Sequence, residues 1–343
     1  MKVNQFPDRI IEINNEEFLY FGGTAYLGLP TNEAFQRIFI QNILKWGTAY
    51  GSSRTANIKL TAYDNGEDFL AKHINSEAAL TISSGMLAGK LVLEVLAKET
   101  DCFFHFANIH PALRVPSSLP FFIENELNPR LLNSTTEKIT ILTDSVPSFH
   151  TQAIDLSILN VIPSTKKITL VVDESHSLGI LGTNGSGIYS NISISTIKRK
   201  IMIASLGKAF GLTGGVIASD SNFIKQVNEL DTFISSASMS AAAVQTMADA
   251  AIIYLQQHQK LKKNLKYIDT HLLKNKAVHF DVNYPLIYPE IDEIKEILLA
   301  NKIIATNFKY PTGTKDLNRI VITANHKKED LDRIIAILNQ NIL

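Results

Sequence analysis

The 343-residue chain has a single cysteine and no excess of charge of either sign. One cysteine, Cys102, excludes an intramolecular disulfide framework. The 33 basic and 33 acidic residues cancel, so no net field would draw the chain to nucleic acid or to an anionic membrane. No apolar run has the length of a membrane span, and the first eight residues lack the apolar core of a signal peptide. We therefore expect a soluble cytoplasmic protein with neither nucleic acid nor membrane as a partner.

Hydrophobic residues make up 45% of the chain, enough for a substantial core. Short apolar runs alternate with helical patterns along the sequence. The runs that predict strands are 77–82, 102–106, 119–123, 139–142, 168–172, 201–204 and 215–218. Helical patterns cover 86–97, 223–227 and the stretch from 241 to about 273. Unbroken apolar runs separated by helices are typical of a mainly parallel sheet that is covered on both faces.

The C-terminal part has a different pattern, with a strand predicted at 319–323 and a helix at 330–343. In that helix Leu331, Ile334, Ile335 and Leu338 share one face, which indicates packing in a smaller α+β module. The length of the chain fits two domains of roughly 100–200 residues each. We therefore predict an α/β fold with an N-terminal segment at 1–30, a large domain at 31–240 and a small domain at 241–343.

Two charged residues follow predicted strands. Asp173 ends the run 168–172, and Lys208 follows the run 201–204 in the pattern Ser-x-Gly-Lys. In an open α/β sheet, ligands bind at the carboxyl ends of the strands. A lysine there can form an imine and a carboxylate can hold a protonated ring nitrogen, and pyridoxal phosphate (PLP) requires both. A lysine among glycines is by itself more often merely solvated, but its combination with Asp-x-x-His and a following Gly-Gly favours a PLP site.

Several motifs together resemble those of the α-oxoamine synthases, a family of fold-type I PLP enzymes. The resemblance extends over nearly the whole chain, and the motifs occur in the order of the family. They are 25–29, 51–54, 84–88, 173–187, 205–211, 235–239 and 319–326. The family includes 8-amino-7-oxononanoate synthase and serine palmitoyltransferase.

The resemblance implies a role for four residues at the PLP ring. Lys208 would hold PLP and then move a proton at the α-carbon of the substrate, a role that suits a lysine whose amine titrates readily when buried. Asp173 would pair with the pyridine nitrogen, His176 would lie near the phenolic oxygen, and His110 would stack on the opposite ring face. Taken alone, a histidine at a strand end such as His176 is more often a structural group, and the alternative for His110 is an ordinary loop histidine.

The other site positions are also implied by the resemblance. The phosphate would be bound by Ser84, Gly85, Met86 and Ser205, and the ring would be lined by Asp144 and Ser148. Either Ser236 or Ser238 would supply a hydroxyl from the partner subunit. Arg319 would receive the α-carboxylate of the amino acid, because a planar guanidinium matches that anion. The resemblance also implies a homodimer with residues of both subunits at each site, and no metal is expected.

Positions on the substrate side depart from the family pattern. Thr24-Ala25 replaces an asparagine, Ile58 and Tyr63 stand where the family has glycine and histidine, and Gly89 replaces a second asparagine. The expected reaction is condensation of a small α-amino acid with an acyl thioester of coenzyme A or a carrier protein, with decarboxylation to an α-amino ketone. Which amino acid and which acyl donor stays open. The alternatives are an aminotransferase or a retro-aldol lyase of the same fold, or a PLP-binding protein without turnover.

Overall fold

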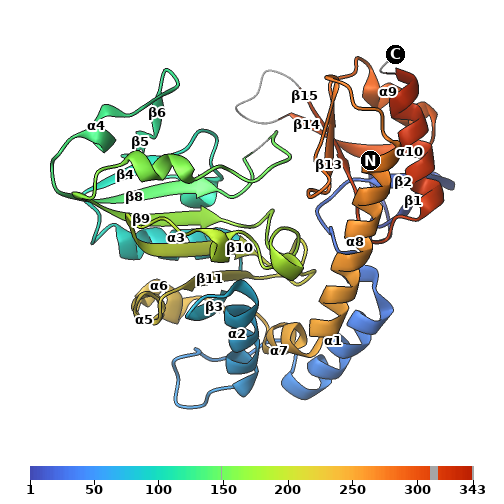
Figure 1. Ribbon diagram of the computed structural model, residues 1–343. Helices are drawn as coiled ribbons and strands as arrows, with labels where there is room; N and C mark the ends of the chain where they lie inside the picture. The colour runs from blue at the N-terminus through green and yellow to red at the C-terminus, as the bar shows by residue number, and fades with distance from the viewer. Residues whose placement is uncertain (148, 310–315, 342–343) are drawn as a thin grey trace. The chain divides into compact units, whose positions relative to one another are not determined.

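The computed structural model describes residues 1–147, 149–309 and 316–341. The chain forms two compact units. The large unit comprises 37–208 and 212–251, and the small unit comprises 1–36, 209–211 and 252–343. Each unit contains its own sheet (Figure 1). The N-terminal segment thus lies in the same unit as the C-terminal part of the chain.

The large unit contains a seven-stranded sheet in the order β3-β11-β10-β9-β8-β4-β5. Its strands are β3 (Ala78–Ile82), β4 (Cys102–His105), β5 (Leu119–Pro120), β8 (Glu137–Asp144), β9 (Lys166–Asp173), β10 (Ile197–Ser205) and β11 (Gly215–Ser219). Neighbours pair in parallel, except that β11 is antiparallel to both β10 and β3. Because β11 alone is reversed, the carboxyl ends of the other strands lie at one edge. The predicted α/β fold with a mainly parallel sheet is confirmed.

Helices cover this sheet. The helices in this part of the chain are α1 (Glu33–Trp46), α2 (Thr61–Ile74), α3 (Gly85–Leu96), α4 (Pro129–Leu132), α5 (Ser221–Asn228), α6 (Asp231–Ser235) and α7 (Ala241–Asp249). Of these, α3 packs against β10 and β11, and α5 against β3 and β11. All five residues of β11 are buried, so both faces of the sheet are covered there.

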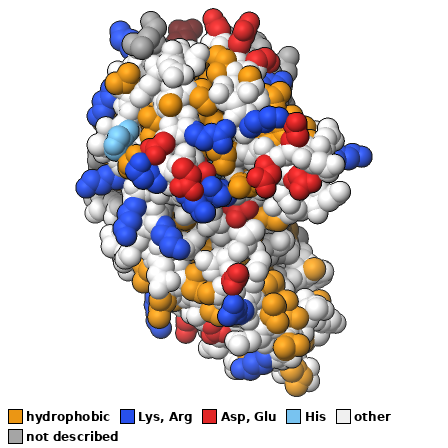
Figure 2. All heavy atoms as spheres, turned by 90° about the vertical axis from the view of Figure 1, so that its right-hand side faces the viewer, with side chains coloured by type: hydrophobic (Ala, Val, Ile, Leu, Met, Phe, Trp, Pro, Cys, Tyr) orange, Lys and Arg blue, Asp and Glu red, His pale blue; other side chains and the backbone are white. Residues whose placement is uncertain are grey.

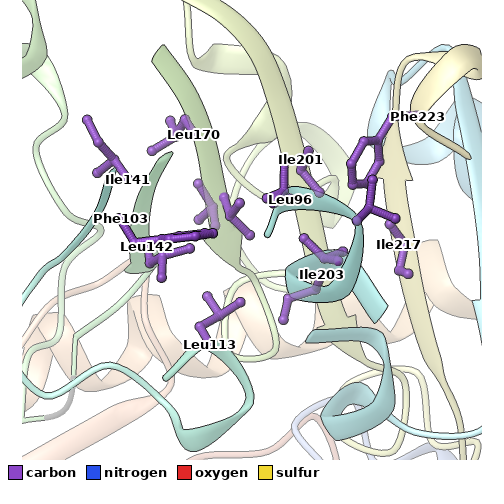
Figure 3. Packing of buried hydrophobic residues seen from close by; sticks show 14 of the residues in the cluster. Leu96, Phe103, Leu113, Ile141, Leu142, Leu170, Ile201, Ile203, Ile217 and Phe223 are labelled. Carbon is purple, nitrogen blue, oxygen red and sulfur yellow. The ribbon is translucent and has the colours of Figure 1, made fainter. Parts of the chain in front are cut away.

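The core lies between the sheet and these helices. Figure 3 shows Leu96 of α3 and Phe223 of α5 beside Ile201, Ile203 and Ile217 of β10 and β11. Ile201 and Ile203 are two residues apart and therefore point to the same face. This packing holds α3 against β10 and β11, whose ends lie next to predicted site residues.

The small unit contains a six-stranded sheet in the order β1-β2-β14-β15-β13-β12. Its strands are β1 (Ile10–Ile13), β2 (Glu16–Phe21), β12 (Val278–Phe280), β13 (Leu286–Pro289), β14 (Ile303–Lys309) and β15 (Asp316–Val321), and its helices are α8 (Ala251–His271), α9 (Ile294–Ala300) and α10 (Lys328–Asn341). This is the predicted α+β module, with two N-terminal strands that the sequence patterns did not reveal.

Three predicted elements need correction. The strand predicted at 119–123 is wrong: β5 ends at Pro120, and Phe122–Ile123 (β6) instead forms a hairpin with Glu126–Leu127 (β7). Glu124 and Asn125 in the turn both have positive φ, as a tight hairpin turn requires. The helix predicted from 241 to about 273 is interrupted at Ala250, whose ψ of 12° is not helical.

The strand predicted at 319–323 ends at Val321, because the amide of Thr323 donates to the ring Nδ1 of His326 at 2.9 Å. None of the helices in the described ranges is long and apolar enough to cross a membrane. On the face drawn in Figure 2, basic and acidic side chains are interspersed, in keeping with their equal numbers.

Candidate active site

The carboxyl-end edge of the large sheet carries most of the predicted site residues. Asp144 ends β8 and Asp173 ends β9, and the two are directly opposite each other in the strand register. Ser205 ends β10, three residues before Lys208, and β3 leads into Ser84. Residues far apart in the sequence therefore meet at the edge where open α/β sheets bind ligands.

Lys208 and His176 are in contact at this edge. The lysine Nζ lies 2.9 Å from the histidine Nε2, within hydrogen-bond distance. The two side chains come from the loops that follow the adjacent strands β10 and β9. When the lysine carries its proton, the amine donates and the imidazole nitrogen accepts. The pair can therefore exchange a proton at a defined position.

Asp173 is buried, with 6% of its surface exposed. Its Oδ1 accepts the amide of Ser175 at 2.9 Å, and its Oδ2 lies 3.8 Å from Nδ1 of His110. A buried carboxylate is costly unless it is hydrogen-bonded or paired with a positive group. The position therefore suits an anion that acts on a cationic partner.

Two residues of the same loop were not singled out by the sequence analysis. The Oγ of Ser175 accepts the amide of Ser205 at 2.8 Å and so links the ends of β9 and β10. Glu174 is fully buried, and its Oε2 accepts the Ser177 hydroxyl and the Ile188 amide, both at 2.7 Å. Burial raises the pKa of Glu174 to about 7, against the effect of these donors. The signal for both lay in the block 173–177, where only the first and fourth residues were assigned roles.

His110 is held from two directions. Its main-chain amide donates to both oxygens of Asp144, at 3.2 and 3.1 Å, and its Nδ1 accepts the amide of Ala112 at 3.3 Å. Burial lowers the pKa of His110, the Asp173 carboxylate opposes this, and the charge of Lys208 adds to it. These effects favour a neutral imidazole.

The N-terminus of α3 has the features of an anion site. Ser84 is the N-cap, and its Oγ accepts the amide of Leu87 at 3.1 Å. The amides of Gly85 and Met86 precede any acceptor within the helix, because the first turn has none. Exposed amides and the helix dipole together favour a phosphate at such a position.

This turn lies directly against the ends of β10 and β11. A Cβ on Gly215 would lie 2.5 Å from the carbonyl carbon and oxygen of Ser84. A Cβ on Gly85 would lie 3.0 Å from the Cα and amide nitrogen of Ser205. Glycines at both positions thus allow three backbone segments to meet, and they bring Ser205 beside the predicted phosphate position.

The remaining predicted residues lie elsewhere. Between α6 and α7, Ser236 donates to the carbonyl of Thr232, and Ser238 forms a hydrogen bond with the hydroxyl of Tyr63. Ser148 lies outside the described residues. Arg319 is on β15 of the small unit, opposite Thr306 of β14.

In the small unit, the charge of Arg319 acts on three tyrosines. Burial raises the pKa values of Tyr20, Tyr26 and Tyr284, and the charge of the arginine opposes that rise for each of them.

The residues at the large sheet's edge fit PLP. The amine of Lys208 can form an imine with the aldehyde, the buried carboxylate of Asp173 can accept the N–H of the protonated ring nitrogen, and the amides at the N-terminus of α3 can donate to the phosphate. With the mainly parallel sheet, they define the class of fold-type I PLP-dependent transferases.

Comparison with known proteins identifies the family of the chain. The family described as aminotransferase class I and II matches residues 126–338, and the chain belongs to this family. The 8-amino-7-oxononanoate synthase of Petrotoga mobilis is 29% identical over 94% of this chain and 88% of its own length. That of Thermoanaerobacter pseudethanolicus is 27% identical over 93% of this chain and 86% of its own.

Solved structures agree on the fold. Serine palmitoyltransferase of Sphingomonas wittichii is 17% identical, with a TM-score of 0.80 over 97% of this chain and 89% of that one. The 8-amino-7-oxononanoate synthase of Francisella tularensis is 22% identical, with a TM-score of 0.71 over 94% of this chain and 97% of that one. The chain is therefore an enzyme, a PLP-dependent transferase similar to the α-oxoamine synthases.

Proposed function

We propose that the protein condenses a small α-amino acid with an acyl thioester, releasing carbon dioxide and the free thiol and forming an α-amino ketone. The observation that carries this proposal is the 2.9 Å contact of Lys208 with His176 beside the buried carboxylate of Asp173. It is supported by relatives 27–29% identical over 93–94% of this chain. Their product, 8-amino-7-oxononanoate, is by its name an α-amino ketone with a methyl group next to the amine, which is the fragment that alanine leaves on decarboxylation.

Three residues serve the proton chemistry in this proposal. Bound PLP supplies the electron sink for the carbanion that forms at the α-carbon of the amino acid. Lys208 takes the α-proton on its Nζ and returns a proton to the product, and His176 orients that amine through its Nε2. Asp173 holds a proton on the ring nitrogen by its buried negative charge.

Other residues bind and orient. The amides of Gly85 and Met86 and the hydroxyl of Ser205 hold the phosphate. The imidazole of His110 covers one face of the ring and excludes water from it. Arg319 receives the α-carboxylate of the amino acid through its guanidinium fork.

We further propose that the protein acts as a cytoplasmic homodimer, with Ser236 or Ser238 reaching the phosphate in the partner's site. Ser148 would line the ring, as the sequence resemblance implies.

The deciding experiment supplies alanine, glycine or serine together with an acyl-coenzyme A to the PLP-loaded protein. We expect free thiol and carbon dioxide in equal amounts, and only when both substrates are present. Keto-acid formation without thiol release would make the protein an aminotransferase, and release of an aldehyde would make it a retro-aldol lyase. If no amino acid exchanges its α-proton, the protein binds PLP without turnover.

The lysine assignment has a separate test. Borohydride reduction of the PLP-loaded protein should attach the cofactor to the peptide that contains Lys208, and Lys208→Ala should abolish this labelling. Lys225→Ala on α5 is the matched control, since that lysine side chain is 75% exposed and pairs with Glu229, four residues further along the same helix. Labelling at any other lysine would refute the role of Lys208.

A further inference from the structure

We propose that Asp144 is a positioning residue for His110: its carboxylate holds the main-chain amide of residue 110 and thereby fixes the imidazole plane at the site. The inference rests on the proposed function, because that function places the imidazole on the face of the PLP ring. It replaces the expectation that Asp144 merely lines the ring.

The geometry shows that the Asp144 carboxylate binds the main chain of His110. Both oxygens of Asp144 lie within hydrogen-bond distance of the His110 amide, at 3.2 and 3.1 Å. The carboxylate stands at the end of β8, and the loop that carries His110 follows the neighbouring strand β4. The bond therefore ties a loop residue to a rigid strand end.

The residues that follow His110 also restrict its conformation. Pro111 confines the preceding residue to extended backbone, and His110 has φ −58° and ψ 143°. Its Nδ1 accepts the amide of Ala112, which fixes the ring relative to its own backbone. Once the amide of residue 110 is also held, the position of the imidazole is determined.

The charge of Asp144 contributes to this hold. An amide donates a stronger hydrogen bond to an ionised carboxylate than to a neutral acceptor. Burial, together with the negative charge of Asp173 on β9, raises the pKa of Asp144 to about 7. The His110 amide, Lys208 and Arg114 act in the opposite direction. The hold on His110 should therefore be stronger above neutral pH than below it.

A double-mutant cycle separates positioning from direct contact with the cofactor. The variants are Asp144→Ala, His110→Ala and the double variant, and the first measurement is the PLP dissociation constant from the cofactor's absorbance. We expect each single change to weaken PLP binding about 10-fold: His110→Ala removes the imidazole from the ring face, and Asp144→Ala removes the hydrogen bond to a charged group that positions it. The double variant should bind no more weakly than His110→Ala, since alanine leaves no imidazole to position.

Two further variants sharpen the test. Asp144→Asn keeps an acceptor oxygen without the charge, so it should weaken PLP binding less than Asp144→Ala and should reduce the dependence of affinity on pH near 7. Asp101→Ala is the matched control: Asp101 accepts the amide of Lys138 at 2.8 Å near the opposite end of β8. It should lower stability without changing PLP affinity.

The second measurement needs no cofactor. Amide hydrogen exchange of a peptide spanning 107–113 in the PLP-free protein should be faster in Asp144→Ala than in the parent. Additive effects in the cycle, unchanged exchange, or an equal loss of PLP affinity in Asp101→Ala would each overturn the inference. A parent protein that binds no PLP would defeat the proposed function, while the exchange measurement would still report whether Asp144 holds residue 110.

Discussion

Gly215 is the position where one added methyl group should disturb the phosphate-binding turn most. It begins β11, and a Cβ there would lie 2.5 Å from the carbonyl carbon and oxygen of Ser84 and 2.6 Å from the amide nitrogen of Gly85. All three atoms belong to the main chain, so no flexible side chain can move aside. The change Gly215→Ala therefore acts directly on the backbone that precedes α3.

The size of the effect follows from these distances. Ordinary contact with a Cβ begins at 3.4 Å, so the turn must move by about 0.9 Å, the difference from 2.5 Å. Overpacking of this kind costs about 1–3 kcal/mol of folding stability. A displacement of this size also takes an amide of Gly85 or Met86 out of hydrogen-bond range of a phosphate. Each such bond to a charged group contributes about 1.5–3 kcal/mol, so PLP affinity should fall by roughly 10- to 150-fold.

Absorbance titration of PLP and denaturant unfolding of the PLP-free protein together test this reasoning. Gly51→Ala is the matched control, because a Cβ there would meet no atom within 4 Å. We expect Gly51→Ala to keep both stability and PLP affinity. If Gly215→Ala binds PLP as tightly as the parent, the phosphate does not depend on the turn at Ser84–Met86.

Three further predictions concern other residues. Asp173→Asn should keep the fold but lower the rate of α-deuterium exchange of amino acids by about 30-fold or more, the result of removing one partner of a buried charge pair; an unchanged rate would show that another acid serves the ring. Arg319→Leu should weaken amino-acid binding by about 2–5 kcal/mol with PLP retained, measured by titration of the PLP-loaded protein, and equal affinity would make the arginine structural. Burial lowers the pKa of His326 from 6.5 to about 4, so the folded state keeps the neutral form while the unfolded chain takes up a proton. Stability should therefore fall as the pH drops from 6.5 towards 4, by about 2 kcal/mol at pH 5, and denaturant unfolding of His326→Asn should lack this part of the pH dependence.

The strands that position the site were predictable because their signal is local. The runs before Asp173 and Ser205 are continuous and apolar, as expected of parallel strands buried on both faces, and both are strands in the structure. Elements with weaker local signals were missed or misread. Nothing in the sequence around Ala250 marks the break between α7 and α8, since neither glycine nor proline occurs there.

The arrangement of the site depends on the order of the strands, which no local pattern contains. Ser84 and Ser205 are neighbours because β3 pairs with β11 and β11 with β10, although β3 precedes both by more than a hundred residues. Motif resemblance could assign each serine to the phosphate but could not show that Gly215 brings them together.

The same limit applies to Asp144 and Asp173. The sequence shows each of them as a polar residue at the end of an apolar run. That the two lie side by side follows only from the register of β8 and β9, in which they stand opposite each other. That register puts one carboxylate on the amide of His110 and the other 3.8 Å from its ring. A sequence motif gives the chemical groups that a cofactor needs, whereas the sheet decides which of them act on one another. Tests of this site should therefore compare pairs of residues across neighbouring strands rather than single residues.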